Sequence, residues 1–323
     1  MISFLSLTLK LWPELAEYMK TIGVLWDEEV TWDGEKPFDG ASNESYGYFS
    51  EIAGEQDVRL VQAQYNWYSD GVLSRGWVYD GGSWSKVEDV ELDGVFDKFH
   101  FDEETKAFKQ EISESVGILN DPGLEELCKD KLLTYERFPE MMPETRSFSE
   151  ENAREMLEEY GKIVLKPCYA FGGKGIHIVD KEGDIPDIEG EYIVQRFVDS
   201  SGGIEGIVEG THDLRGIVVN GDLKAGYVRY SDGEISNVSQ GGSQHAVSPE
   251  EFPEKALDMI KTVNNELGYR PCLFSVDLFF DEEGEPWIVE LNSKPGIGFY
   301  GDEEMREQLV PVMDSLAEAF KQL

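Results

Sequence analysis

Short apolar runs alternate with segments of helical spacing along the first part of the chain. Residues 22–26, 57–64 and 93–99 read as strands, and 75–87 as a hairpin around Asp80-Gly81-Gly82. A helix is expected over 103–115, followed by a short apolar segment at 116–121. Strands that alternate with helices predict a small open α/β domain here.

A second series of elements follows Asp121-Pro122-Gly123, which interrupts the pattern. We expect helices over 124–138 and 149–160, strands over 162–167, 175–179 and 192–198, and a hairpin at Asn220-Gly221. Ser248, with Pro249 and Glu251 behind it, predicts the start of a helix that runs to Gly268. A last helix is expected over about 302–321. The predicted boundaries are an N-terminal domain over 19–122 and a second domain over 123–323.

The first eighteen residues stand apart from this pattern. No basic region leads them and no small-residue cleavage site follows, so they do not read as a signal peptide. Met19 directly precedes the first predicted strand, and we expect it to be the natural start, with 1–18 as an extension. An ordinary N-terminal helix is the alternative.

Acidic residues dominate the charge of the chain. Its 323 residues include 66 Asp and Glu against 28 Lys and Arg, a formal net charge of -38. Hydrophobic residues still make up 40 %, with 7 Trp, 14 Tyr and 17 Phe, so the chain folds around a core. The charge disfavours nucleic acid and anionic membranes as partners. Acid spread along the whole chain is typical of a protein kept dissolved in concentrated salt, and a merely acidic protein is the alternative.

Cysteine and histidine usage excludes several kinds of site. Cys128, Cys168 and Cys272 form no CxxC pair, and the four histidines show no HExxH spacing. A disulfide scaffold or zinc centre is therefore not expected, and a cytoplasmic location fits. No apolar run approaches the length of a membrane span.

The segment 272–293 carries the most informative pattern. If Glu283-Gly284 is the turn of a hairpin, Asp277 lies directly opposite Glu290, and Asn292 falls on the same face. Two opposed carboxylates destabilise a hairpin unless a cation lies between them. Asp, Glu and an Asn amide are ligands that suit Mg²⁺ held together with substrate phosphates. A solvated acidic face is the alternative.

A glycine-rich loop and a few basic residues point to an anionic ligand. Lys166 ends one strand, and Phe171-Gly172-Gly173-Lys174-Gly175 precedes the next, where backbone N–H groups can approach phosphates. A simple hairpin loop is the alternative. Lys131, Lys166 and Lys174 lie at the ends of predicted elements, and Arg215 and Arg229 lie on neighbouring strands, in a chain with few cations.

These segments, in this order, resemble the ATP-grasp superfamily, and most of all the branch of ribosomal-protein glutamate ligase and glutathione synthetase. The resemblance covers about residues 116–300 and rests on the following pieces: Asn120-Asp121-Pro122, Asp130-Lys131 with Thr134, Pro143-Glu144-Thr145, Val164-Leu165-Lys166-Pro167, the loop 171–175, Ile193-Val194-Gln195-Arg196-Phe197-Val198, Asp213-Leu214-Arg215, Ser236-Asn237 with Gly241-Gly242, Asp277, and Glu290-Leu291-Asn292-Ser293.

The resemblance implies an α/β fold of the ATP-grasp type, with a lid lobe over about 135–195 and a C-terminal lobe over about 196–323. It implies that Lys131 and Lys166 hold ATP phosphates, that the loop around Gly172, Gly173, Lys174 and Gly175 closes over them, and that Asp213 lies near the nucleotide or substrate. The remaining implied roles are these: Gln195, Arg196, Phe197 and Val198 line the adenine, largely through backbone groups; Arg215 and Asn237 face the transferred phosphate; Asp277, Glu290 and Asn292 bind a pair of Mg²⁺ ions, for which Mn²⁺ is a substitute.

The sequence also departs from the family pattern. Arg196 stands where an acidic or amide residue is frequent, and Ile235 and Gln240 stand where a basic residue is common. We expect Arg229 to supply the missing charge, unless the acyl substrate differs.

The implied function is an ATP-dependent carboxylate–amine ligase that forms an amide through an acylphosphate and releases ADP and phosphate. The substrates are small carboxylates and amines or a peptide or protein tail, chosen by the N-terminal domain and by segments 199–212 and 240–247, where His212 and His245 are expected at the surface. The alternatives are a non-catalytic ATP-binding protein and a phosphotransferase of the same fold. The sequence leaves open whether the chain forms a homo-oligomer.

Overall fold

The computed structural model describes residues 19–169, 174–231, 243–299 and 301–323. The chain divides into two compact units, each described by itself below. The first comprises residues up to Asn120 with 297–302 and 313–323, and the second comprises 121–296 with 303–312. The division at 120/121 lies close to the expected boundary, whereas part of the C-terminal segment groups with the first unit. The expectations for residues 1–18 lie outside the described residues.

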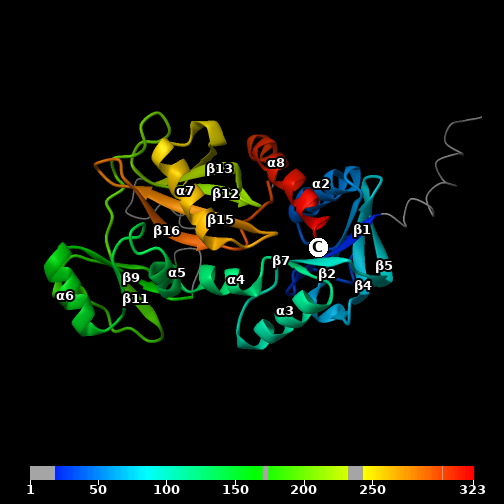
Figure 1. Ribbon diagram of the computed structural model, residues 1–323, viewed down its shortest axis with the longest axis horizontal. Helices are drawn as coiled ribbons and strands as arrows, with labels where there is room; N and C mark the ends of the chain where they lie inside the picture. Colours follow the sequence, from blue (N-terminus) through cyan, green and yellow to red (C-terminus); the bar gives the residue numbers. More distant parts are fainter. Residues whose placement is uncertain (1–18, 170–173, 232–242, 300) are drawn as a thin grey trace, which may run out of the picture. The chain divides into compact units, whose positions relative to one another are not determined.

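The first unit contains a seven-stranded mixed sheet of order β3-β4-β2-β1-β6-β7, with β5 paired to β4 (Figure 1). Strands β2, β1, β6 and β7 run parallel, and β4 joins β2 antiparallel. The strands are β1 (Lys20–Trp26), β2 (Val58–Gln64), β3 (Tyr68–Ser69), β4 (Val72–Asp80), β5 (Ser83–Glu91), β6 (Gly94–Asp97) and β7 (Ile118–Leu119).

Helices cover both faces of this sheet because its parallel strands alternate apolar residues toward both sides. Ile112 of α3 (Glu103–Ser115) packs with Leu25, Val61 and Val95 on one face. On the other face, Phe49 of α2 (Ser42–Glu55) contacts Phe320 at the end of α8 (Glu303–Phe320). The expected small α/β domain is confirmed.

The second unit contains two antiparallel sheets (Figure 1). The four-stranded sheet has the order β10-β9-β11-β8, and the five-stranded sheet has the order β14-β13-β12-β15-β16. The strands are β8 (Thr145–Ser147), β9 (Ile163–Pro167), β10 (His177–Val179), β11 (Tyr192–Arg196), β12 (Thr211–Val219), β13 (Asp222–Ser231), β14 (Ser243–Ala246), β15 (Leu273–Phe280) and β16 (Pro286–Asn292).

Each of these sheets buries one face against helices and leaves the other face for polar side chains. Helix α6 (Glu150–Tyr160) packs Ala153 and Met156 against β9 and β11. Helix α7 (Glu254–Leu267) buries Ala256, Ile260 and Val263 against β12 and β15, as its spacing predicts. None of the helices in the described ranges is long and apolar enough to cross a bilayer.

Two local expectations were wrong and one helix was not predicted. The helix predicted over 124–138 is broken into α4 (Pro122–Lys129) and α5 (Lys131–Arg137), because the Asp130 side chain accepts hydrogen bonds from the N–H groups of Leu132 and Leu133 and caps a new helix. Ser248 caps only a single 3₁₀ turn at Pro249–Glu251, and α7 starts later. Helix α2 was not predicted at all.

Candidate functional site

The hairpin β15–β16 brings two predicted metal ligands together. Asp277 pairs with Glu290, as expected, but Leu278 pairs with Ile288, so Val289 is an extra bulged residue. The bulge lets Ile288 and Leu291 both reach the core, at 0 % and 1 % exposure, instead of lying on opposite faces as strict alternation predicts. The turn spans 281–285 and is wider than the expected Glu283-Gly284.

A buried ion-pair network covers the polar face of the five-stranded sheet. Arg215 on β12 lies opposite Asp277 and donates two hydrogen bonds to its carboxylate, from Nε to Oδ1 at 2.6 Å and from Nη2 to Oδ2 at 2.5 Å. Arg229 on β13 donates from Nη2 to the same Oδ2 at 2.7 Å and holds Asp213 through Nε at 2.8 Å. Glu290 stays at the edge, 3.9 Å from Arg215 Nη2.

The electrostatics of this network follow from its burial. Burial alone would raise the pKa of Asp277, but the guanidinium groups of Arg215 and Arg229 hold that pKa below its ordinary value. Asp213 shares Arg229 with Asp277, and burial raises the pKa of Asp213 to about 6. Both arginines stay charged, because the neighbouring carboxylates keep their pKa values high against the effect of burial.

The two predicted phosphate-binding lysines lie close to this face. Lys131 begins α5, directly behind the capping Asp130, and Lys166 lies near the end of β9; each is 7 % exposed. Burial lowers the pKa of Lys131 and lowers that of Lys166 to about 8. The Glu290 carboxylate is near enough to oppose both shifts. The structure therefore brings both lysines and the hairpin carboxylate together in one region.

Lys166 donates its hydrogen bond to a neutral amide. Its Nζ lies 2.8 Å from Gln195 Oε1, and Gln195 Nε2 donates to Thr145 Oγ1 at 2.8 Å. A buried ammonium held by an amide carries a full charge toward a ligand, whereas one paired with a carboxylate does not. This pairing suits an anion-binding site.

The other residues expected around the nucleotide are placed as follows. The guanidinium of Arg196 lies over the Trp287 ring, 4.5 Å from its centroid, and the backbone N–H of Arg196 donates to the Glu144 carbonyl oxygen. Phe197 stacks under the Lys162 ammonium, Val198 is buried, and Lys174 and Gly175 are exposed beside β10. The expectations for Gly172, Gly173, Ile235, Asn237 and Gln240 lie outside the described residues.

Sequence reasoning missed two residues of this unit. Tyr227 on β13 lies opposite Arg215, and its Oη accepts a hydrogen bond from Arg215 Nη1 at 3.1 Å. Tyr227 and Arg229 are two residues apart on one strand and so share a face, which is the sequence feature that could have identified Tyr227. His212, expected at the surface, is fully buried: its Nε2 accepts from the Phe280 N–H at 3.3 Å, and burial lowers its pKa. It stays neutral and ties β12 to β15.

The donor chemistry of Asp277, Glu290 and Asn292 fits a hard cation such as Mg²⁺. All three offer oxygen atoms from adjacent strands, and Glu290 is accessible, with a side chain 22 % exposed. Asp277 Oδ2 accepts two guanidinium hydrogen bonds and Oδ1 accepts one, so a metal ion at Asp277 competes with the positive charges of Arg215 and Arg229. Over the described residues, no group of three His, Cys, Asp or Glu side chains is placed to hold a metal ion. The Asn292 Oδ1 accepts a hydrogen bond from the Lys294 N–H at 2.9 Å.

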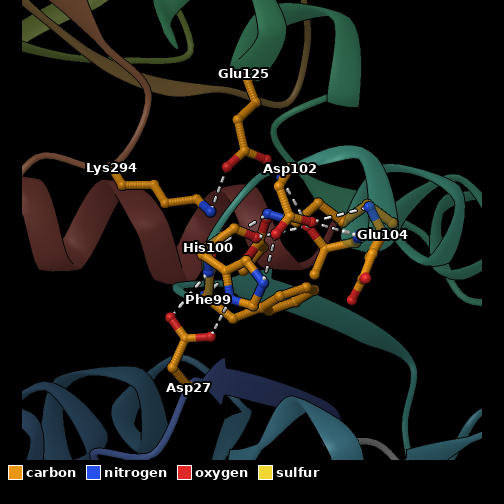
Figure 2. A network of polar contacts seen from close by, with 10 residues as sticks. Asp27, Phe99, His100, Asp102, Glu104, Glu125 and Lys294 are labelled. Carbon is orange, nitrogen blue, oxygen red and sulfur yellow. Dashed lines mark hydrogen bonds and ion pairs between the residues drawn. The ribbon is translucent and has the colours of Figure 1, made fainter. Parts of the chain in front are cut away.

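The first unit holds a cavity of 560 Å³ in the loops that follow β1, β2 and β6. Its lining is Asp27, Glu28, Glu29, Tyr65, Asn66 and His100. Figure 2 shows the His100 ring between Asp27 and Asp102, with Nδ1 at 2.5 Å and Nε2 at 3.2 Å from their carboxylates. Its three carboxylates repel polyphosphate, which disfavours this cavity as a nucleotide site.

A family model agrees with the arrangement in the second unit. The model described as YheC/D like ATP-grasp matches residues 127–202, which contain α5, the four-stranded sheet, Lys131 and Lys166. This part of the chain is similar to the ATP-grasp superfamily. The matched segment is part of the second unit, so it does not decide the branch within the superfamily.

Curated relatives of this chain are distant. It is 26 % identical over 187 residues to the carbamoyl phosphate synthase large chain, C-terminal section, of Methanopyrus kandleri, covering 51 % of this chain and 33 % of that one. It is 29 % identical over 169 residues to glutathione synthetase of Yersinia pestis, covering 51 % and 50 %. It is 27 % identical over 199 residues to tetrahydromethanopterin:alpha-L-glutamate ligase of Methanocaldococcus jannaschii, covering 56 % and 63 %. The chain thus spans less than two thirds of their lengths.

Solved structures show the same fold over almost the entire chain. D-cycloserine synthetase DcsG aligns with a TM-score of 0.62 at 13 % identity, covering 93 % of this chain and 99 % of that one. A RimK domain protein ATP-grasp from Sphaerobacter thermophilus aligns with a TM-score of 0.57 at 14 % identity, covering 93 % and 99 %. At these identities the likeness establishes the ATP-grasp fold.

Proposed function

We propose that this chain is an ATP-dependent carboxylate–amine ligase that forms an amide through an acylphosphate. One observation carries the proposal. Two buried lysines, one of them held by a neutral amide, lie beside a sheet face that carries two buried arginines and the opposed carboxylates Asp277 and Glu290. Such a site offers cations for a polyphosphate and oxygen ligands for a divalent ion in one place.

The proposed reaction needs little covalent chemistry from the protein. A substrate carboxylate oxygen attacks the γ-phosphorus of ATP, the bond to the β-phosphate oxygen breaks, and ADP leaves. An amine then attacks the acyl carbon, and the tetrahedral intermediate releases phosphate to give the amide. Lys131 and Lys166 bind the phosphates, and Arg215 and Arg229 stabilise charge that develops on the transferred group. Mg²⁺ bound by Asp277, Glu290 and Asn292 would neutralise phosphate oxygens.

The distant relatives support this class of reaction. Two of the three named above are a synthetase of glutathione and a glutamate ligase by name. The third is named a carbamoyl phosphate synthase, so phosphoryl transfer to an oxygen acid stays the second candidate. A nucleotide-binding protein without turnover is the third, because the Asp277 oxygens are both held by arginines.

The decisive experiment measures ADP formation from MgATP with pooled carboxylates and amines, and mass spectrometry of the same samples. Concentrated potassium chloride is required, because a net charge of -38 favours unfolding by self-repulsion at low salt. ADP that requires both a carboxylate and an amine, with a condensed product, is the expected result. ADP without an amine would indicate phosphotransfer, and ATP binding without ADP under every condition would indicate the non-catalytic alternative.

A further inference from the structure

The side chain of Gln195 has a different role from the one the sequence suggests. The resemblance places Gln195 beside the adenine, acting through its backbone. In the structure the Gln195 side chain lies between Lys166 and Thr145 in a continuous series of hydrogen bonds. Thr145 is its direct partner across the β8–β11 ladder, and Lys166 lies two pairs further along the β9–β11 ladder. All three side chains therefore share the face of the sheet opposite α6.

The direction of this series is fixed at its far end. Thr145 Oγ1 donates its proton to the Pro143 carbonyl oxygen at 2.8 Å. Its oxygen therefore accepts from the Gln195 amide nitrogen, which turns the amide oxygen toward Lys166. Only one orientation of the amide satisfies both neighbours, so Thr145 determines which atom Lys166 meets.

Burial makes the series rigid. Thr145 and Gln195 are each 3 % exposed and Lys166 is 7 % exposed, so water does not compete freely for these groups. Burial already lowers the pKa of Lys166 to about 8, and loss of the amide oxygen would leave its ammonium with poorer solvation still. The amide oxygen thus favours the charged form of Lys166 and limits the positions of Nζ.

We propose that Gln195 is a positioning residue: it holds the Lys166 ammonium where the polyphosphate part of the nucleotide binds, and Thr145 orients the Gln195 amide. This inference rests on the proposed function. Gln195 acts through Lys166 and has no role in recognising the base. The polyphosphate-binding set therefore extends from β9 across β11 to β8, and Thr145 belongs to it although it does not touch the ligand.

The test separates the two ends of the nucleotide. Gln195→Met has the same length and lacks both polar atoms. Its affinity for tripolyphosphate, ADP and adenosine is measured by calorimetry in concentrated potassium chloride, beside the wild type. We expect affinity for tripolyphosphate and ADP to fall about tenfold, the usual effect of losing one hydrogen bond to a charged group, while adenosine binding is unchanged. Equal losses for adenosine and ADP would overturn the proposal, because Gln195 would then recognise the base.

Two further variants distinguish positioning from a general effect on folding. Thr145→Val removes the hydroxyl at constant shape and should weaken tripolyphosphate binding, whereas Thr145→Ser keeps the hydroxyl and should restore it. In a Lys166→Met background, Gln195→Met should have no further effect on tripolyphosphate affinity. An additive loss in that background, or equal affinity in Thr145→Val and Thr145→Ser, would contradict the role.

Failure of the proposed function gives a different pattern. A folded wild type that binds neither ADP nor tripolyphosphate would overturn the nucleotide site itself. A wild type that binds both, with unchanged affinity in Gln195→Met, would overturn only the role of Gln195.

Discussion

The affinity of the site for polyphosphate should depend on pH through Lys166. Burial lowers the pKa of this lysine from 10.5 to about 8, so its charge changes within an accessible pH range. With that pKa, about nine tenths of the ammonium is charged at pH 7 and about one tenth at pH 9. Only the charged form attracts phosphate, so affinity for ADP should fall by up to about tenfold between pH 7 and pH 9.

Calorimetric titration of ADP at several pH values measures this slope. The Lys166→Met variant should bind ADP weakly at every pH, and subtracting its profile removes the titration of the ligand itself. Lys166→Arg keeps a permanent charge and should lose the fall in affinity above pH 8. Lys131→Met should keep the part of the slope due to Lys166. A flat profile in the wild type, or the same slope in Lys166→Met, would refute the assignment.

Three more perturbations test the network and the fold. Arg229→Gln removes a positive charge and one of the two guanidinium hydrogen bonds to Asp277 Oδ2, and should tighten Mn²⁺ binding about tenfold by electron paramagnetic resonance. Arg196→Gln is the control, because the Arg196 guanidinium lies over Trp287, and it should leave Mn²⁺ binding unchanged. Weaker Mn²⁺ binding in Arg229→Gln would contradict the competition. His212 has a pKa below its ordinary value of 6.5, so the folded state binds fewer protons than the unfolded state and the unfolding free energy should fall as pH drops below 6.5. His212→Gln should lose that part of the slope in denaturant titrations; an identical slope would exclude the histidine. Lys109→Met should cost about 3–5 kcal/mol of unfolding free energy, because it removes the ammonium that lies 2.6 Å from the buried Asp97 carboxylate. Adding Asp97→Asn should recover part of that loss, and an effect near zero would show that the ion pair is not important for stability.

Local patterns predicted most elements, because turns and caps act over few residues. Asn220-Gly221 joins β12 to β13 with both residues at positive φ, at 50° and 99°, as a tight hairpin requires. The pairing of Asp277 with Glu290 was predicted from an assumed turn at Glu283-Gly284. The turn spans 281–285 instead, and the pairing holds because the bulge at Val289 shifts the register back by one residue. No local pattern predicted this bulge, since it depends on which residues the core accepts.

Tertiary packing determined what the sequence could not show. Helix α2 contains two glycines and little amphipathic character, and it forms because Tyr46, Phe49 and Ala53 are buried in the first unit. Likewise, the convergence of Arg215 and Arg229 on Asp277 depends on the order of strands β13-β12-β15, which no local pattern specifies. The sequence identified these residues as candidates and the sheet order placed them together.

The most direct measurement is equilibrium binding of ATP to the full chain and to a Lys131→Met/Lys166→Met double variant, in concentrated potassium chloride with matched unfolding midpoints. Lys181→Met serves as the control, because its side chain is 76 % exposed. We predict that the wild type and Lys181→Met bind ATP alike and that the double variant loses binding. ATP binding that survives in the double variant, or no ATP binding by the folded wild type, would contradict a nucleotide site built on these two lysines.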